Sequence, residues 1–148
     1  MTNNDDEKAL QVLHKAVEIA QENLVEKKEF KPFLLLLNDT QEELLFKNEE
    51  IDSNKSYELL EDLAKEKIAT KNIEVMVLAV DTIVPEKFSK DTPMGIRLHL
   101  EEKSQLNNKL GARFIYVPYE LCKIGDGEMF VKLLDPIPVG LPAEYIKA

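Results

Sequence analysis

The chain has 148 residues, of which 44% are hydrophobic and 32% charged, a balance typical of a single globular domain with its own core. Its 28 acidic and 19 basic residues give a net charge of −9, which disfavours nucleic acid and anionic membrane surfaces as partners. No apolar run approaches the roughly twenty residues of a membrane-spanning helix. The acidic first residues and the single cysteine, Cys122, predict a cytoplasmic protein without a disulfide.

The first predicted element is a long amphipathic helix from Asp5 to about Lys28. Apolar residues recur along it at steps of three and four, the spacing of one helix face. Acidic residues in its first turn suit the positive end of the helix dipole. We expect a buried face made of Ala9, Val12, Leu13, Ala16, Val17, Ala20 and Leu24.

The segment after Pro32 predicts a hairpin followed by a second helix. Phe33–Leu37 is apolar at every position, as in a strand covered on both faces. Asn38–Thr40 supply turn residues, and Glu43–Lys47 is the expected return strand. The second helix carries the apolar stripe Leu59, Leu60, Leu63, Ala64 and Ile68.

Four further strands are predicted in the C-terminal half. They cover Ile73–Val84, Ile96–Glu101, Ala112–Tyr119 and Met129–Leu134, and each is rich in residues that favour strands. Prolines punctuate residues 135–148, so this tail is expected to be extended and to lie over the surface.

These elements predict one α+β domain over residues 1–148. Their order is α-β-β-α-β-β-β-β, and we expect a largely antiparallel sheet with two helices on one face. The strands Ile73–Val84 and Ala112–Tyr119 are apolar on both faces, so something must cover the second face. Two explanations stay open: the tail folds back over it, or a second copy of the chain covers it in a homodimer.

The C-terminal half also contains a series of short motifs. They are Ile96-Arg97-Leu98-His99-Leu100-Glu101, Val117-Pro118-Tyr119, Gly127-Glu128-Met129-Phe130 and Pro136. In these motifs the chain resembles a group of small uncharacterised bacterial proteins. The resemblance implies an α+β fold in a bacterial cytoplasm, and it implies no activity and no catalytic residue.

Three residues are candidates for catalysis: Asp81, His99 and Cys122. Cys122 and His99 have the chemistry of a thiol nucleophile and its base, although Cys122 lacks the small neighbours that admit a substrate and is better explained as a packed thiol. Asp81 interrupts an apolar strand and is either a carboxylate with a raised pKa or a cap of the following loop.

Candidates for binding lie on two other strands. Arg97, His99 and Glu101 alternate along one strand and therefore share a face, which we expect to be an ordinary solvated outer face. Tyr119 belongs to an aromatic strand that is either a binding surface or core. A histidine and a carboxylate are too few for a zinc site, and no glycine-rich phosphate loop occurs, so no metal or cofactor is expected.

The function favoured by these features is non-enzymatic binding, either self-association or binding of a basic protein. The reasons are the acidic charge, the lack of a catalytic constellation and the doubly apolar strands. The alternative is a small hydrolase or ligand-binding enzyme with its site near the loop of residues 85–94.

Overall fold

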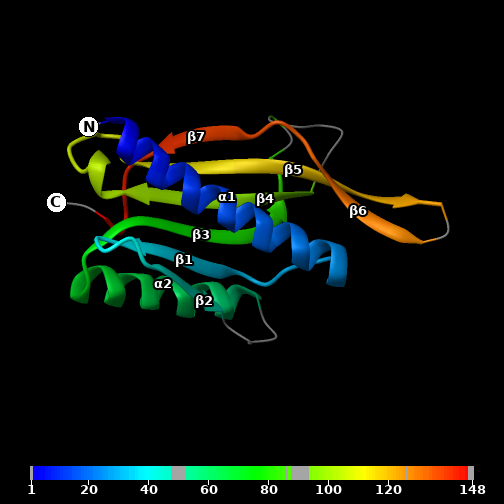
Figure 1. The fold of residues 1–148 in the computed structure, drawn as a ribbon, viewed down its shortest axis with the longest axis horizontal. Coiled ribbons are helices and arrows are strands. Elements are labelled where there is room, and N and C mark those ends of the chain that lie inside the picture. The colour runs from blue at the N-terminus through cyan, green and yellow to red at the C-terminus, as the bar shows by residue number, and fades with distance from the viewer. Residues whose placement is uncertain (1, 48–52, 86, 88–93, 126, 147–148) are drawn as a thin grey trace.

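The N-terminal helix α1 (Thr2–Lys27) crosses the front of a curled sheet (Figure 1). The computed structural model describes residues 2–47, 53–85, 87, 94–125 and 127–146. The helix ends where Lys28 adopts a left-handed φ of 65° and donates its backbone N–H to the carbonyl of Leu24 at 2.9 Å. Of the predicted stripe, α1 buries Ala9, Val12, Ala16, Ala20 and Leu24, whereas Leu13 and Val17 are partly buried; Ile19, which was not predicted, is buried as well.

Strands β1 (Phe33–Asn38) and β2 (Glu43–Lys47) form the predicted hairpin. The side chain of Asn38 shapes its turn, because its Oδ1 accepts the backbone N–H groups of Thr40 at 3.0 Å and Glu42 at 2.9 Å. The register of the hairpin places Lys47 opposite Phe33.

The second helix, α2 (Ser53–Thr70), connects β2 to β3 (Ile73–Ile83). Strand β3 pairs with the other edge of β1, so β1 lies between β2 and β3 and is buried from Phe33 to Leu37. A strand with neighbours on both edges and cover on both faces has no solvated side, which explains its unbroken run of apolar residues.

The remaining strands are β4 (Met94–Glu102), β5 (Ala112–Ile124), β6 (Glu128–Leu133) and β7 (Ile137–Leu141), with a short 3₁₀ helix, η1 (Lys103–Gln105), after β4. The order in the sheet is β2-β1-β3-β4-β5-β6, every pairing is antiparallel, and β7 also pairs with β5. The predicted α+β class and the order of the first eight elements are confirmed, and β7 adds a strand within the proline-rich tail.

Strand β5 is longer than its neighbour β4. Its first half pairs with β4 and β7, whereas residues 119–124 pair with β6. Residues 119–124 and 128–133 therefore form a two-stranded ribbon that projects past the start of β4 (Figure 1), here called the β5–β6 ribbon.

The two helices lie on opposite faces of the sheet, so the prediction that both cover one face is wrong. Phe33, Leu35 and Leu37 of β1 pack in the cluster that contains the α1 residues, while Leu34 and Leu36 pack with α2. Alternate residues of a strand point to opposite faces. Because β1 is apolar from Phe33 to Leu37, each face needs its own cover, and one helix supplies it on each side.

The C-terminal segment completes the second face. Tyr145 and Ile146 are buried in the same cluster as Leu60 and Ala64 of α2. Of the two explanations for the second apolar face, the intramolecular one therefore describes this structure, with α2 contributing as well as the tail. Within the described chain, neither helix has the apolar length that crossing a bilayer requires.

Candidate functional site

Three candidate residues of β4 lie on the face that α2 and the C-terminal segment cover. Arg97, His99 and Glu101 share this face, but His99 is 1% exposed and Glu101 is fully buried. The expectation of an ordinary solvated outer face is therefore wrong. The reason is that residues Glu144 to Ile146 fold over the end of β4.

Glu101 is the anchor of that segment. Its carboxylate accepts the backbone N–H groups of Glu144 at 3.0 Å, Tyr145 at 2.9 Å and Ile146 at 2.8 Å, and it contacts His99 Nε2 at 2.7 Å. Burial opposes ionisation, but the hydrogen bonds from His99 and these amides outweigh it, so the pKa of Glu101 lies below its usual 4.5. Because these contacts are all made within the protein, the Glu101 carboxylate stabilises the fold and has no lone pair directed at a substrate.

His99 is enclosed by aromatic rings. Its centroid lies 5.1 Å from that of Phe114 and 5.3 Å from that of Tyr145. Its Nδ1 atom is buried and has no hydrogen-bond partner among the described residues. Among the described residues, His99 is almost fully buried and lines none of the five hollows that are best formed.

Arg97 sits nearer to solvent on the same face. Its guanidinium lies 4.6 Å from the centroid of the Phe114 ring and 5.5 Å from that of Tyr57, and it donates a hydrogen bond to the Tyr57 hydroxyl at 3.1 Å. Two aromatic rings and a hydroxyl hold this cation in one orientation.

Asp81 and Tyr119 meet on the opposite face of the sheet. The Tyr119 hydroxyl donates to Asp81 Oδ1 at 2.8 Å, and the backbone N–H of Phe30 also bonds the carboxylate. Burial raises the pKa of Asp81 above its usual 3.8 in spite of these bonds, and burial together with Asp81 raises the pKa of Tyr119. Asp81, which interrupts the apolar strand, is thus a partly buried acid that is hydrogen-bonded to a core tyrosine.

Cys122 lies apart from both groups, on the β5–β6 ribbon opposite Phe130. His99 pairs with Phe114, and Cys122 is about 26 Å further along β5 at about 3.3 Å per residue. A thiol and a base need hydrogen-bond reach, so the Cys122–His99 dyad is ruled out by position. Asp81, His99 and Cys122 do not converge.

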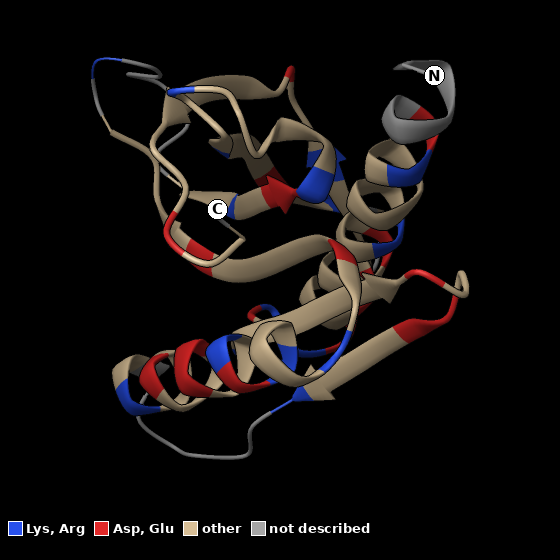
Figure 2. Cartoon of the chain, turned by 90° about the vertical axis from the view of Figure 1, so that its left-hand side faces the viewer, with Lys and Arg blue, Asp and Glu red and all other residues tan. Residues whose placement is uncertain are grey.

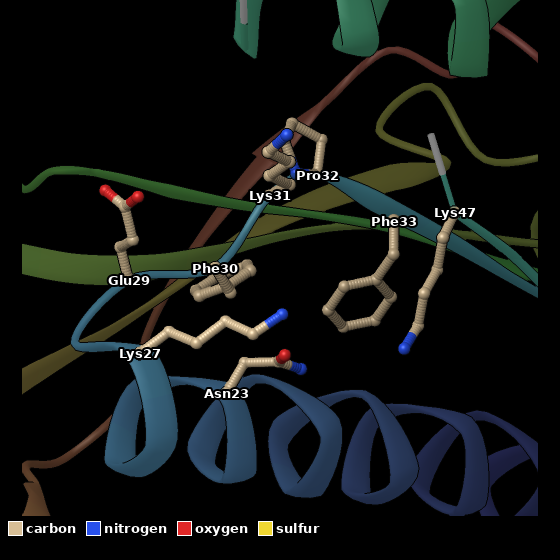
Figure 3. A pocket seen from close by; sticks show the side chains of 8 residues that line it. All are labelled: Asn23, Lys27, Glu29, Phe30, Lys31, Pro32, Phe33 and Lys47. Carbon is tan, nitrogen blue, oxygen red and sulfur yellow. The ribbon is translucent and has the colours of Figure 1, made fainter. Parts of the chain in front are cut away.

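Three hollows remain as places where another molecule could bind. One of about 490 Å³ lies where β3 ends and β4 begins and is lined by Asp81, Arg97 and Tyr57 among others, whereas the predicted site near residues 85–94 falls largely outside the described residues. A second, of about 200 Å³, lies between the end of α1 and the start of β1 (Figure 3). The third is an open groove of about 650 Å³ between α1 and β6.

Sequence reasoning did not select the residues that line the second and third hollows. Lys27 and Lys47 are separated in the chain, and only the register of the β1–β2 hairpin indicates that Lys47 lies beside Phe33 near the end of α1. In the part of the chain that the structure describes, no three acidic, histidine or cysteine side chains are grouped to hold a metal ion.

Comparison of the chain with family models, with curated proteins and with solved structures finds no match. The resemblance of the C-terminal half to small bacterial proteins therefore stays an expectation.

Proposed function

We propose that the protein is a non-enzymatic binding protein whose groove between α1 and β6 receives a basic, amphipathic segment of another protein. The observation that supports this proposal is the pairing of exposed apolar side chains with an acidic wall in one groove of about 650 Å³. The lining residues are Glu18, Gln21, Glu22, Val25, Met129, Phe130 and Val131.

The apolar part of the groove comes from both walls. Val25 of α1 is 42% exposed and Phe130 of β6 is 39% exposed. Met129 and Val131, on either side of Phe130 along β6, also line the groove, and Val131 packs in the cluster that contains the α1 residues. Apolar side chains gathered in a concave site favour a partner that covers them, since each Å² removed from water contributes about 25 cal/mol.

The charged part of the groove is negative. Glu18 and Glu22 stand one turn apart on α1, and none of the residues lining the groove is a lysine or an arginine. The net charge of −9 adds a long-range attraction for cations, and Figure 2 shows the acidic residues spread over helices, loops and strand ends. A partner segment that carries aliphatic and basic side chains complements both the apolar and the acidic parts of the groove.

The free edge of the sheet lies at the same place. Within the described chain β6 pairs only with β5, so its outer backbone N–H and C=O groups are available. An extended segment could add to this edge while its side chains reach the groove, a common mode of peptide recognition.

A binding experiment with defined peptides tests the proposal. Fluorescence anisotropy would compare three short labelled peptides that alternate leucine with lysine, leucine with glutamate, and serine with lysine. We expect the leucine–lysine peptide to bind best, because it alone matches both the apolar side chains and the glutamates of the groove.

Charge-matched variants locate the binding. Glu18→Lys with Glu22→Lys should weaken binding of the leucine–lysine peptide about tenfold or more, whereas Glu58→Lys with Glu66→Lys makes the same change of charge on exposed positions of α2 and should have a much smaller effect. Equal losses in both variants would show general attraction to an acidic protein and would remove the groove from consideration.

The hollow where β3 ends and β4 begins supports a second candidate, a small-ligand-binding protein. Its volume of about 490 Å³ suits a small molecule, and its lining includes one cation, Arg97, and two acids, Glu29 and Asp81. Amide NMR shifts confined to the ends of β3 and β4 on addition of a fragment library would favour it, and their absence would remove it.

A further inference from the structure

The hollow under the linker between α1 and β1 has a chemistry unlike that of the rest of the molecule. It measures about 200 Å³, roughly the volume of seven water molecules, so it has room for a small molecule. Its lining comes from the end of α1, the linker, the start of β1 and the end of β2: Asn23, Lys27, Glu29, Phe30, Lys31, Pro32, Phe33 and Lys47.

Two lysines from different elements approach this hollow, here called the lysine pocket. Lys27 extends from the last turn of α1 and Lys47 from the end of β2, and Figure 3 shows their ammonium groups on either side of the Phe33 ring. In the same view the carboxylate of Glu29 points away from the Lys27 ammonium group. The nearest acid among the lining residues is therefore not positioned to neutralise them.

The positive charge is not explained by the fold. Neither Lys27 nor Lys47 has an ion pair with another described residue. Lys27 suits the negative end of the α1 dipole, but Lys47 belongs to a strand and has no such role. Two cations without an ion pair among the described residues, at one hollow of a chain with net charge −9, favour an anion beside them.

The wall of the lysine pocket is aromatic. Phe30 and Phe33 are 6% and 2% exposed, and their ring centroids lie 5.9 Å apart. Asn23 lies below them, and its Nδ2 donates to the carbonyl of Ile19 at 2.8 Å, which fixes the amide and leaves its oxygen for a ligand hydroxyl or N–H. Apolar rings beside two ammonium groups match a molecule with one anionic end and one apolar end.

We propose that the lysine pocket binds a small organic anion, with its carboxylate or phosphate between Lys27 and Lys47 and its apolar body against Phe30 and Phe33. None of these residues lines the groove between α1 and β6, so this site and the proposed partner site are independent.

Titration followed by amide NMR tests the site. The probes are phenyl phosphate, benzoate, inorganic phosphate and the neutral benzyl alcohol. We expect saturable shifts at residues 23–33 and 47 with phenyl phosphate and benzoate, weaker shifts with inorganic phosphate, and none with benzyl alcohol. The ranking of phenyl phosphate against benzoate decides between phosphate and carboxylate as the preferred anion.

Two double variants, each of which replaces two lysines by glutamine, test whether the charge of the lysine pocket is responsible for binding. Lys27→Gln with Lys47→Gln should weaken binding of the preferred probe about tenfold or more, while Lys15→Gln with Lys65→Gln removes two exposed lysines of α1 and α2 and should leave it unchanged. Thermal melts show that each variant is folded. Shifts outside the pocket, equal losses in both variants, or benzyl alcohol binding as well as phenyl phosphate would each overturn the proposal.

Discussion

Glu101 shows how one buried acid can order a distant part of the chain. An ionised carboxylate in a protein interior is costly unless it is fully hydrogen-bonded. Glu101 meets this condition with His99 and three consecutive amides from the C-terminal segment. The charge thus connects β4 to Tyr145 and Ile146, whose side chains then cover the second face of the sheet.

Replacing Glu101 by glutamine tests this connection. Glu101→Gln keeps the size of the side chain but loses the charge and presents N–H groups to N–H donors, so we expect a loss of about 2–3 kcal/mol in the free energy of unfolding at neutral pH. Hydrogen exchange at residues 144–146 should accelerate. Glu58→Gln, on the exposed side of α2, is the control, and equal effects of the two changes would contradict the anchor.

The pH dependence of this variant follows from the direction of the shift. Because the folded pKa of Glu101 lies below its usual 4.5, its contribution to stability is present above that pH and is lost as the pH falls through the folded value. The deficit of Glu101→Gln should therefore shrink between about pH 5 and strongly acidic solution. Melting temperatures across that range measure it.

Asp81 should behave in the opposite way. Its folded pKa is raised from 3.8, so the folded state binds the proton more tightly than the unfolded chain, and stability falls as the pH rises through this range. Asp81→Asn keeps an acceptor for the Tyr119 hydroxyl without a charge. We expect it to melt at a higher temperature than the parent at about pH 7 and to lose this advantage near pH 3. A variant less stable than the parent at pH 7 would contradict this account.

At the scale of elements, α1 depends on the apolar stripe that packs against the sheet. Leu24 is fully buried, whereas Leu10 of the same helix is 63% exposed. Leu24→Ala should cost about 2–5 kcal/mol because it opens a cavity in the core. Leu10→Ala should change stability by less than about 0.5 kcal/mol. Chemical denaturation of both variants measures the difference, and similar costs would show that α1 is packed in another way.

The elements themselves could be predicted from sequence because each has a local signal. The stripe of α1, the apolar run of β1 and the turn at Asn38 depend on residues close together in the chain. The side of the sheet on which each helix lies has no such signal. The strand run Phe33–Leu37 indicates two covered faces, but it does not say which helix covers which.

The site residues were harder to interpret for the same reason. Alternation along β4 correctly places Arg97, His99 and Glu101 on one face. What makes that face buried is the backbone of residues 144–146, which are remote in sequence and carry no motif. Lys27 and Lys47 likewise become neighbours only through the hairpin and the linker, so no spacing between them could have been recognised.

At the scale of the whole molecule, the two proposed binding sites lie in different places and carry opposite charges. The groove between α1 and β6 carries glutamates, and the lysine pocket at the end of α1 carries cations. A protein with net charge −9 attracts basic partners over several ångströms of solvent, an effect that salt screens. Peptide binding at the groove should therefore weaken with added salt. Anion binding in the lysine pocket depends on Lys27 and Lys47 and not on the net charge of the chain.

The last prediction concerns the oligomeric state. A homodimer is one of the two explanations that the sequence leaves open, because β3 and β5 have apolar residues on both faces. In the structure α1 covers one face, and α2 with Tyr145 and Ile146 covers the other, so the apolar residues of β1 and nearly all of those of β3 are buried within the chain, while Phe114 and Tyr116 on the second face of β5 are partly buried. We therefore expect light scattering at micromolar concentrations to give the monomer mass of 16.9 kDa, without an increase as the concentration rises. A mass that climbs toward twice this value would mean that a surface other than these two faces, such as the free edge of β6, pairs with a second copy.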